Sequence, residues 1–333
     1  MSKLINNNHE KSILTFLESN DLKTIKLEPI KQDASSRRYF RIQNNQNILL
    51  MDSKALENNN YEYIHISNYL NKIGLSAPKI IKSDHKNGLF LIEDFGNLTF
   101  NEALKRNFSE RLLYMNATKC LSTIHKNKIT RKLPVYNNKY LLAELSLFTE
   151  WFFKEINIKL DIKALTQWKK SWIKIFKNIN QNNNKLVLKD FHADNLFWLP
   201  NRVKLQRVGL IDFQDAMIGH VAYDISSLLE DVRRKISNKT KNLVINNFIK
   251  NNNIIDEKDF IKNYNILTAQ RNAKIVGIFI RLARRDHKIN YLKWVNKAMK
   301  IFIKASKEAN LDEILVWIDK HIPKNKLYIN IKD

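Results

Sequence analysis

The stretch that decides the fold is LKDFHADN, residues 188–195, and it is followed by IDFQD, residues 211–215. Short apolar runs precede and follow the first stretch, and a third run leads into the second. Runs of this length between polar residues predict strands, here at residues 185–188, 196–199 and 207–211. We therefore expect a polar loop between two strands, with Asp212 just past the next one.

Three side chains in these stretches have the spacing of a phosphoryl-transfer site. Asp190 precedes Asn195 by five positions, and Asp212 ends the next apolar run. Phosphoryl transfer needs a carboxylate that orients the acceptor hydroxyl and takes its proton, together with hard oxygen ligands for Mg²⁺. We expect Asp190 to be the catalytic base and Asn195 and Asp212 to be metal ligands. An isolated Asp and Asn are common in solvated loops, so the second acid makes the pattern specific.

Three longer segments resemble the aminoglycoside phosphotransferase-like family of small-molecule kinases: LVLKDFHADNLFWLP, VGLIDFQDAMIGHVAYDISSLLEDVRR and QRNAKIVGIFIRLARRDHK. DASSRRYFRI and ILLMDS extend the resemblance, which runs from about residue 33 to about residue 288. Within that family the chain is similar to the bacterial kinases that phosphorylate N-acetylmuramate and N-acetylglucosamine at C1 in cell-wall recycling.

The resemblance implies an α+β, two-lobed, protein-kinase-like fold. A small β-rich N-terminal lobe, residues 1–95, would bind the nucleotide. A larger, mostly helical C-terminal lobe, residues 96–333, would carry the catalytic and substrate-binding residues. ATP and Mg²⁺ are the implied cofactors, and an amino sugar is the implied small-molecule acceptor. Another alcohol, such as an aminoglycoside, a choline-like compound or a nucleoside, is the alternative acceptor.

The sequence departs from the general kinase pattern in three places. Leu188 stands two positions before the catalytic Asp, where a His is common, so we expect apolar packing there. The strand that should carry a phosphate-pairing Lys, residues 48–52, has none, and the next Lys is Lys54. There is also no glycine-rich loop, and the whole chain holds only 6 Gly. Because the strand at residues 48–52 has no Lys, it lacks the residue that forms the usual ion pair with a Glu.

Four polar residues occupy the turn where the glycine-rich loop would lie: Ser35, Ser36, Arg37 and Arg38. Hydroxyl, backbone N–H and guanidinium groups all bind phosphate oxygens. For the two arginines the alternative is a water-exposed position on opposite strand faces. The chain after residue 92 is the expected hinge, whose main-chain groups would pair with adenine. The predicted nucleotide-binding residues are Ser35, Ser36, Arg37, Met51, Glu93, Asp94 and Phe95.

Several other polar residues are candidates for contact with the acceptor. His192, Gln214 and Asp215 lie beside the proposed catalytic and metal residues. Glu144 is expected on a helix, and the alternative is that it is an exposed acid there. Arg271 shares a helix face with Lys274 and Arg281. That face would hold a sugar carboxylate if it borders the substrate, and is otherwise solvated. The predicted substrate-binding residues are His192, Gln214, Asp215, Glu144 and Arg271. Asp224 reads as a helix cap or a loop anchor.

The charge raises a second functional class. The chain has 57 Lys and Arg against 33 Asp and Glu, a net charge of +24, which attracts polyanions. A nucleic-acid-binding protein is therefore the alternative to an enzyme. The Lys residues are scattered among Asn residues, however, and no zinc-ligand or RNA-binding signature occurs, so we expect no specific nucleic acid. A basic chain also favours a neutral or anionic acceptor over a polycationic aminoglycoside.

The cysteine content and the termini set the remaining expectations. Cys120 is the only cysteine, which excludes an intramolecular disulfide and is typical of a reducing compartment. We expect it to be a buried structural thiol on a helix. The first ten residues are polar without an apolar signal core, and the longest strongly apolar stretch is short. These features predict a cytoplasmic protein with no membrane partner. We also expect a monomer.

Hydrophobic periodicity predicts the other elements. Strands are expected at residues 24–31, 38–43 and 48–52, with a turn at residues 44–47, and two more strands flank a turn at residues 85–88. Pro29 suggests that the first is an edge strand. Helices are expected at residues 9–20, 57–72, 109–126, 138–155, 162–179, 222–234, 258–286 and 291–307.

Overall fold

The structure is a computed structural model, and it describes residues 7–22, 26–30, 37–43, 45–53, 60–177, 179 and 184–330. The predictions for Ser35, Ser36 and Lys54 lie outside these residues. The chain divides into two compact units. The first joins residues 1–120 to residues 193–216, and the second joins residues 121–192 to residues 217–333. The lobe boundary after residue 95 remains a prediction.

The first unit contains an antiparallel five-stranded sheet with the strand order β1-β2-β3-β5-β4. Its strands are β1 (Leu27–Pro29), β2 (Arg38–Ile42), β3 (Asn45–Asp52), β4 (Ile80–Asp84) and β5 (Leu89–Glu93). Pro29 lies on an edge strand, as predicted, because an edge position spares the missing N–H group. The predicted turn at residues 44–47 is wrong, since β3 begins at Asn45. The β2–β3 register shifts so that Ile42 pairs with Asn45.

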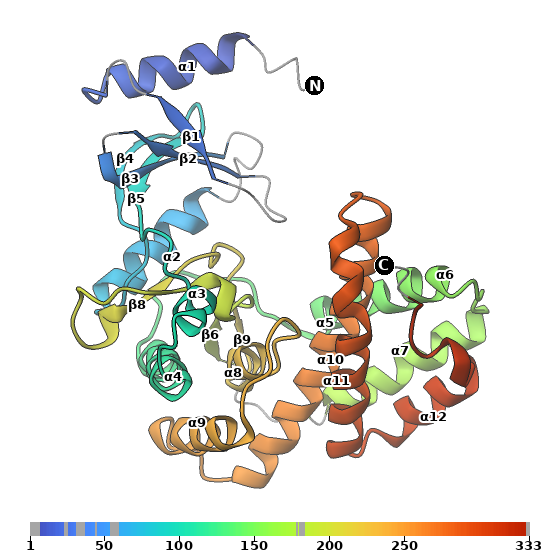
Figure 1. The fold of residues 1–333 in the computed structure, drawn as a ribbon. Coiled ribbons are helices and arrows are strands. Elements are labelled where there is room, and N and C mark those ends of the chain that lie inside the picture. The colour runs from blue at the N-terminus through green and yellow to red at the C-terminus, as the bar shows by residue number, and fades with distance from the viewer. Residues whose placement is uncertain are drawn as a thin grey trace. The chain divides into compact units, whose positions relative to one another are not determined.

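One layer of helix covers this sheet (Figure 1). Helix α1 (Asn7–Glu18) turns Ile13 and Phe16 toward it, where they pack with Leu50 and Leu91 of the sheet. These apolar residues exclude water from the sheet and stabilise the unit. Three further helices follow in the chain: α2 (Asn60–Lys72), α3 (Phe100–Lys105) and α4 (Glu110–Lys126). Cys120 of α4 is fully buried, which confirms the structural thiol.

A short hairpin completes the first unit. Strand β7 (Leu196–Trp198) pairs with β8 (Val208–Leu210), and a 3₁₀ turn, η4 (Lys204–Arg207), precedes the second strand. The hairpin contacts the segment that follows the sheet, because the Trp198 N–H donates to the Leu98 carbonyl at 2.8 Å. Both predicted strands are confirmed. Another 3₁₀ turn, η3 (Ala193–Asn195), leads directly into β7.

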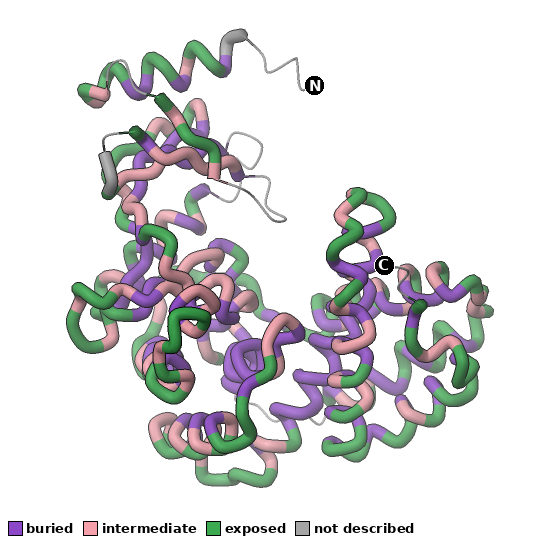
Figure 2. Tube along the Cα trace, in the orientation of Figure 1, coloured by how far each residue is buried: buried purple, intermediate pink, exposed green. Residues whose placement is uncertain are grey.

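The second unit is mostly helical. Strand β6 (Lys185–Val187) pairs with β9 (Met217–Gly219), and helix α8 (Ala222–Leu229) is buried along its whole length (Figure 2). The other helices are α5 (Asn138–Leu147), η2 (Phe148–Phe152), α6 (Phe153–Glu155), α7 (Ile162–Lys177), α9 (Asn238–Asn251), α10 (Glu257–Arg284), η5 (Ile289–Trp294), α11 (Val295–Glu308), α12 (Asp312–His321) and η6 (Lys324–Lys326). Most predicted helices are confirmed.

Some helical predictions need correction. The helix expected at residues 222–234 ends at Leu229, because the Asp231 carboxylate accepts the Arg233 N–H at 2.9 Å and replaces helical bonding. Helices α3, α9 and α12 were not predicted. The helix expected at residues 138–155 contains a π-helical turn, η2.

That π-helical turn organises an aromatic core. Phe148 stacks on Phe152 with a centroid separation of 5.1 Å, and both rings are fully buried. Trp168 of α7 stacks on Phe148 at 5.4 Å. These three rings therefore belong to the core of the second unit. Helix α10 crosses the same turn at Gly277, where a side chain would meet the Leu147 backbone at 2.3 Å. In the described part of the chain, no helix is long and apolar enough to cross a membrane.

Candidate active site

In the second unit, a buried carboxylate accepts hydrogen bonds from the backbone of the loop that carries Asp190. Asp224 of α8 accepts the N–H groups of Leu188 at 2.7 Å and Lys189 at 2.9 Å, so it is the loop anchor that the sequence predicted. Lys189 has a left-handed backbone, with φ of 72°, which is uncommon for a residue with a side chain. Leu188 is 3% exposed, so apolar packing there is confirmed. These contacts hold the backbone of the loop in place just before Asp190.

Asp190 is partly buried among positive charges of the same unit. Burial opposes its ionisation, but the neighbouring basic groups, above all Lys274, outweigh burial and hold the pKa of the carboxyl below its ordinary value. Asp190 is therefore ionised near neutral pH. An ionised carboxylate accepts hydrogen bonds, which is the state that a base for an alcohol proton requires.

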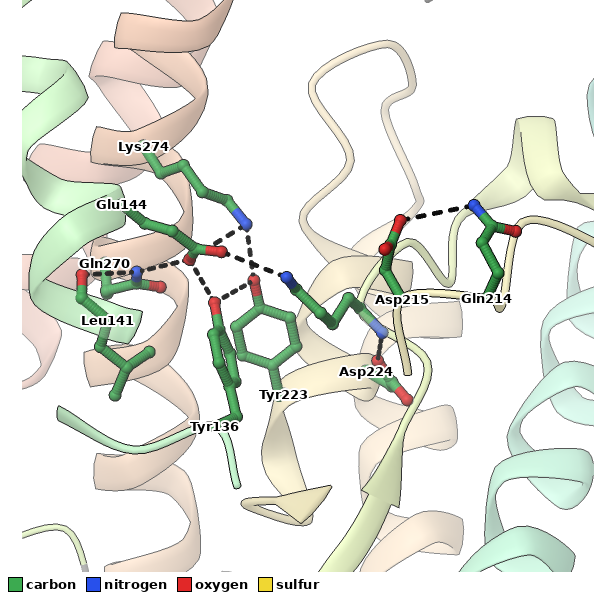
Figure 3. A network of polar contacts seen from close by, with 10 residues as sticks. Tyr136, Leu141, Glu144, Gln214, Asp215, Tyr223, Asp224, Gln270 and Lys274 are labelled. Atoms are coloured by element: carbon green, nitrogen blue, oxygen red, sulfur yellow. Dashed lines mark hydrogen bonds and ion pairs between the residues drawn. The ribbon is translucent and has the colours of Figure 1, made fainter. Parts of the chain in front are cut away.

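A polar network connects α5, α8 and α10 in the second unit (Figure 3). The Lys274 ammonium donates to the Tyr223 hydroxyl at 2.9 Å and lies 3.2 Å from a Glu144 carboxylate oxygen. The Tyr136 hydroxyl donates to Glu144 and lies 3.1 Å from the Tyr223 hydroxyl. Lys189 lies 3.5 Å from the other Glu144 oxygen. Tyr136, Lys189 and Lys274 thus contact the Glu144 carboxylate directly.

The network also shifts the pKa values of Glu144 and Lys274 so that both side chains are charged near neutral pH. Burial raises the pKa of Glu144, but Lys274 and Lys189 outweigh it and hold that pKa below its ordinary value. Burial lowers the pKa of Lys274, but Glu144 and the neighbouring acids raise it overall. The alternative of an exposed helix acid at Glu144 is wrong, because Gln270 also binds it at 3.1 Å.

Two other predicted substrate residues of the second unit are buried. His192 is 8% exposed, and burial lowers its pKa despite the neighbouring Asp231 carboxylate. Arg271 is 5% exposed on α10, three residues before Lys274, which is 8% exposed. The solvated alternative for this helix face is therefore wrong at both positions. Sequence reasoning named neither Tyr136 nor Tyr223, and no local pattern distinguishes them from core tyrosines.

The first unit brings together the two predicted metal ligands. The Asn195 amide donates to Asp212 Oδ2 at 3.2 Å, and the Gln214 amide donates to Oδ1 at 2.8 Å. Asp212 has a left-handed backbone with φ of 60°, a conformation that Asp tolerates better than most residues. Gln214 lies 3.4 Å from the exposed Asp215 (Figure 3). Two amides thus orient the Asp212 carboxylate.

Arg37 lies in the same electrostatic surroundings as Asp212. Its guanidinium is 5.6 Å from the ring centre of Tyr63, and Tyr63 stacks on Phe213 at 5.1 Å. Burial raises the pKa of Tyr39 to about 12, with the Arg37 charge lowering it and the Asp212 charge raising it. Arg37 is 2% exposed, so the water-exposed alternative is wrong for it.

The strand where a phosphate-pairing Lys was expected carries a carboxylate with its own partners. Asp52 accepts from Arg38 Nε at 3.0 Å and lies 3.0 Å from His9 Nε2. Arg38 is therefore engaged within the sheet, although 35% of its side chain is exposed. Met51 beside it is fully buried between Tyr39 and Phe90 in the strand pairing.

The expected hinge is packed against the hairpin of the first unit. The N–H groups of Glu93 and Asp94 donate to backbone carbonyls of the sheet region, at 3.0 Å and 2.9 Å. Arg202 forms an ion pair with Glu93 and places its guanidinium 5.2 Å from the Phe95 ring centre. Asp94 pairs with Arg41 at 2.8 Å. These contacts hold the side chains of the segment and engage two of its N–H groups.

Comparisons with known proteins show which family the sequence matches. A family model described as the phosphotransferase enzyme family matches residues 26–242. An N-acetylmuramate/N-acetylglucosamine kinase of Caulobacter vibrioides is 28% identical over 356 residues, covering 96% of this chain and 98% of the relative. A kinase of the same name from Pseudomonas aeruginosa is 27% identical over 274 residues, covering 80% and 79%.

Solved structures share the fold at low identity. A choline/ethanolamine kinase family protein from Mesorhizobium loti matches with a TM-score of 0.63 and 11% identity, covering 94% of this chain and 99% of that one. An ADP-bound aminoglycoside phosphotransferase matches with a TM-score of 0.58 and 15% identity, covering 90% and 99%. The predicted fold class, with a small antiparallel sheet and a mostly helical remainder, is confirmed.

Proposed function

This chain belongs to the phosphotransferase enzyme family, and we propose that it transfers the γ-phosphoryl group of ATP to the anomeric hydroxyl of an amino sugar, N-acetylmuramate or N-acetylglucosamine. The names of its relatives from two bacteria support the acceptor. The family match also favours a kinase over the nucleic-acid-binding alternative.

The observation that carries this proposal is the state of Asp190. It is an ionised carboxylate on a loop that Asp224 tethers through two N–H groups. In the proposed reaction Asp190 accepts a hydrogen bond from the sugar hydroxyl and takes its proton as the oxygen bonds to the γ-phosphorus. The bond from that phosphorus to the ADP oxygen breaks, and ADP leaves with its electron pair. The loop tether reduces the cost of aligning base and hydroxyl.

The oxygen atoms of the first unit fit Mg²⁺. Asn195 and Asp212 are in direct contact, and together they offer carboxylate and amide oxygens, the hard ligands that Mg²⁺ prefers. Gln214 helps to orient the carboxylate. We assign metal binding to Asn195 and Asp212. When bound there, Mg²⁺ would supply charge neutralisation for the phosphate oxygens of ATP.

For the nucleotide, we assign phosphate contact to Arg37 and adenine contact to the main chain around Phe95. Arg37 takes the place of the missing Lys, since the charges of Arg37 and Asp212 both act on Tyr39. Ser35 and Ser36 remain in the proposed phosphate turn, and Met51, Glu93 and Asp94 in the proposed adenine region. We further propose that residues 1–95 form the nucleotide lobe of a cytoplasmic monomer.

An acceptor screen tests the proposed function. The protein is incubated with ATP and Mg²⁺ and with one acceptor at a time: the two amino sugars, an aminoglycoside, choline and a nucleoside. We expect ADP release with the amino sugars, and ³¹P NMR should locate the new phosphate on C1. The Asp190→Asn variant is the background control. ADP release with another alcohol alone would disprove the acceptor. Oligonucleotide binding with a steep salt slope and no ADP release would instead support the nucleic-acid alternative.

A further inference from the structure

Arg271 of α10 is a buried cation. It is 5% exposed, and its Nε atom is fully buried. Across the described ranges of the chain, this Nε–H group has no hydrogen-bond partner. A buried guanidinium without a partner is costly, because the lost hydration is not replaced. Such a group is retained where a ligand supplies the missing acceptors.

The neighbours of Arg271 on α10 already have partners. Lys274, on the same helix face, donates to Tyr223 and pairs with Glu144. Gln270 donates to Glu144 and to the Leu141 carbonyl. Glu144 thus already has several partners, and Lys274 is one of them. Arg271 is therefore the cation on this helix face that can bind an anionic ligand.

Arg271 influences the residues that would position the acceptor. Its charge acts on Asp190, the proposed base, and on Asp224, which anchors the loop of that base. All three residues belong to the second unit. The charge of Arg271 would therefore also act on a ligand whose hydroxyl contacts Asp190.

We propose that Arg271 binds the carboxylate of the acceptor sugar, so that the enzyme selects a lactyl-substituted amino sugar, N-acetylmuramate, over the neutral N-acetylglucosamine. This inference rests on the proposed function. A planar guanidinium matches a carboxylate with two parallel N–H···O bonds, which a neutral acceptor does not form. The transferred phosphoryl group is the competing anion.

Steady-state kinetics with three acceptors tests this role. The acceptors are N-acetylmuramate, its lactyl methyl ester and N-acetylglucosamine, each with saturating ATP and Mg²⁺. For the wild type we expect a KM about tenfold lower for N-acetylmuramate than for the two neutral sugars. Arg271→Gln should raise the KM for N-acetylmuramate to that of the ester, so that the KM ratio of the two acceptors falls to about one whatever change in kcat all three acceptors share. Arg271→Lys should restore part of the preference.

The control variant is Arg284→Gln on the same helix, where the exposed Arg284 pairs with Glu155 at 2.8 Å. It should leave all three KM values unchanged. Activity on N-acetylglucosamine shows in the same assay that Arg271→Gln is folded. An equal loss of kcat on all three acceptors with the KM ratio unchanged would place Arg271 at the phosphoryl group and overturn the proposal. If the wild type phosphorylates none of the sugars, the proposed function fails, and this inference fails with it.

Discussion

The Asp224 carboxylate accepts the backbone N–H of Lys189 at 2.9 Å, one residue before the proposed catalytic base. The bond joins helix α8 to a residue with a left-handed backbone, and a second bond to Leu188 fixes the preceding peptide. Backbone strain of this kind persists only where surrounding contacts outweigh it. The position of Asp190 thus depends on a side chain 34 residues further along the chain.

Removal of this anchor should affect both stability and turnover. Asp224→Ala leaves two buried N–H groups without acceptors, at a cost of about 1–3 kcal/mol each. We expect a lower urea midpoint and a kcat at least about tenfold lower, because the loop loses its alignment. The control is Asp256→Ala, which removes an acceptor for the Asp259 N–H at the exposed start of α10 and should leave kcat unchanged. Equal kcat in the wild type and Asp224→Ala would contradict the anchor role.

Asp224 should also make stability depend on pH. Burial raises the pKa of this carboxyl to about 7, whereas it is about 3.9 in the unfolded chain. Between these values the folded protein holds a proton that the unfolded chain has released, so the free energy of unfolding falls as pH rises. The slope is at most about 1.4 kcal/mol per pH unit.

Urea unfolding of the wild type and Asp224→Asn at pH 5, 6 and 7 isolates this contribution. The difference between the two proteins should shrink as pH rises toward 7, because the Asn side chain does not titrate. A difference that is independent of pH would show that Asp224 is ionised throughout this range.

Asp190→Ala should separate chemistry from nucleotide binding. A general base contributes about 10²–10⁴-fold to rate, so kcat should fall by that factor. Calorimetry should give an unchanged Kd for the nucleotide, because we assign Asp190 to the acceptor alone. An equal loss of turnover and of nucleotide affinity would refute this assignment.

Asp212→Ala should have the opposite signature. We expect nucleotide affinity to lose its dependence on Mg²⁺, because Asn195 alone is a weak ligand set. Titration of ATP with and without Mg²⁺ measures this, and Glu28→Gln, exposed on edge strand β1, is the control. Metal dependence equal to that of the wild type would exclude Asp212 as a ligand.

Gly277→Ala tests the packing of α10. In an exposed helix this change stabilises by about 1 kcal/mol. Here the new Cβ would lie 2.3 Å from the carbonyl atoms of Leu147, which are backbone and have little freedom to move. We expect a net loss of about 1–3 kcal/mol in urea unfolding. Lys258→Ala, exposed on the same helix, should change stability by less than about 0.5 kcal/mol, and a stabilised Gly277→Ala would contradict the close approach.

Local patterns predicted most of the fold. The strands around LKDFHADN follow from short apolar runs, and α10 follows from a long apolar period. Helix α9 was missed because NKTKNLVINNFIKN is rich in residues with weak helix propensity. Burial of Val244 and Phe248 and the Ser237 cap stabilise it instead, and these are tertiary effects. The π-helical turn η2 likewise has no local signature.

The candidate site likewise contains residues that local patterns predicted and residues that they did not. Asp190, Asn195 and Asp212 were found because they lie close together in the chain and have chemistry-bearing side chains. The network around Glu144 joins residues from four separate segments, so no spacing predicts it. One signal was present: Lys274 lies on the same helical face as Arg271. Its burial and its contact with Tyr223 come from helix packing, which periodicity does not specify.

The one cysteine of this chain makes it well suited to optical distance measurements. Cys120 is fully buried, and burial raises the pKa of its thiol, so little thiolate is available to react with maleimides. Lys82→Cys and Lys258→Cys introduce exposed thiols, one in each unit, that would carry a donor and an acceptor dye. Energy transfer between the dyes would then report, molecule by molecule, how the two units move during turnover.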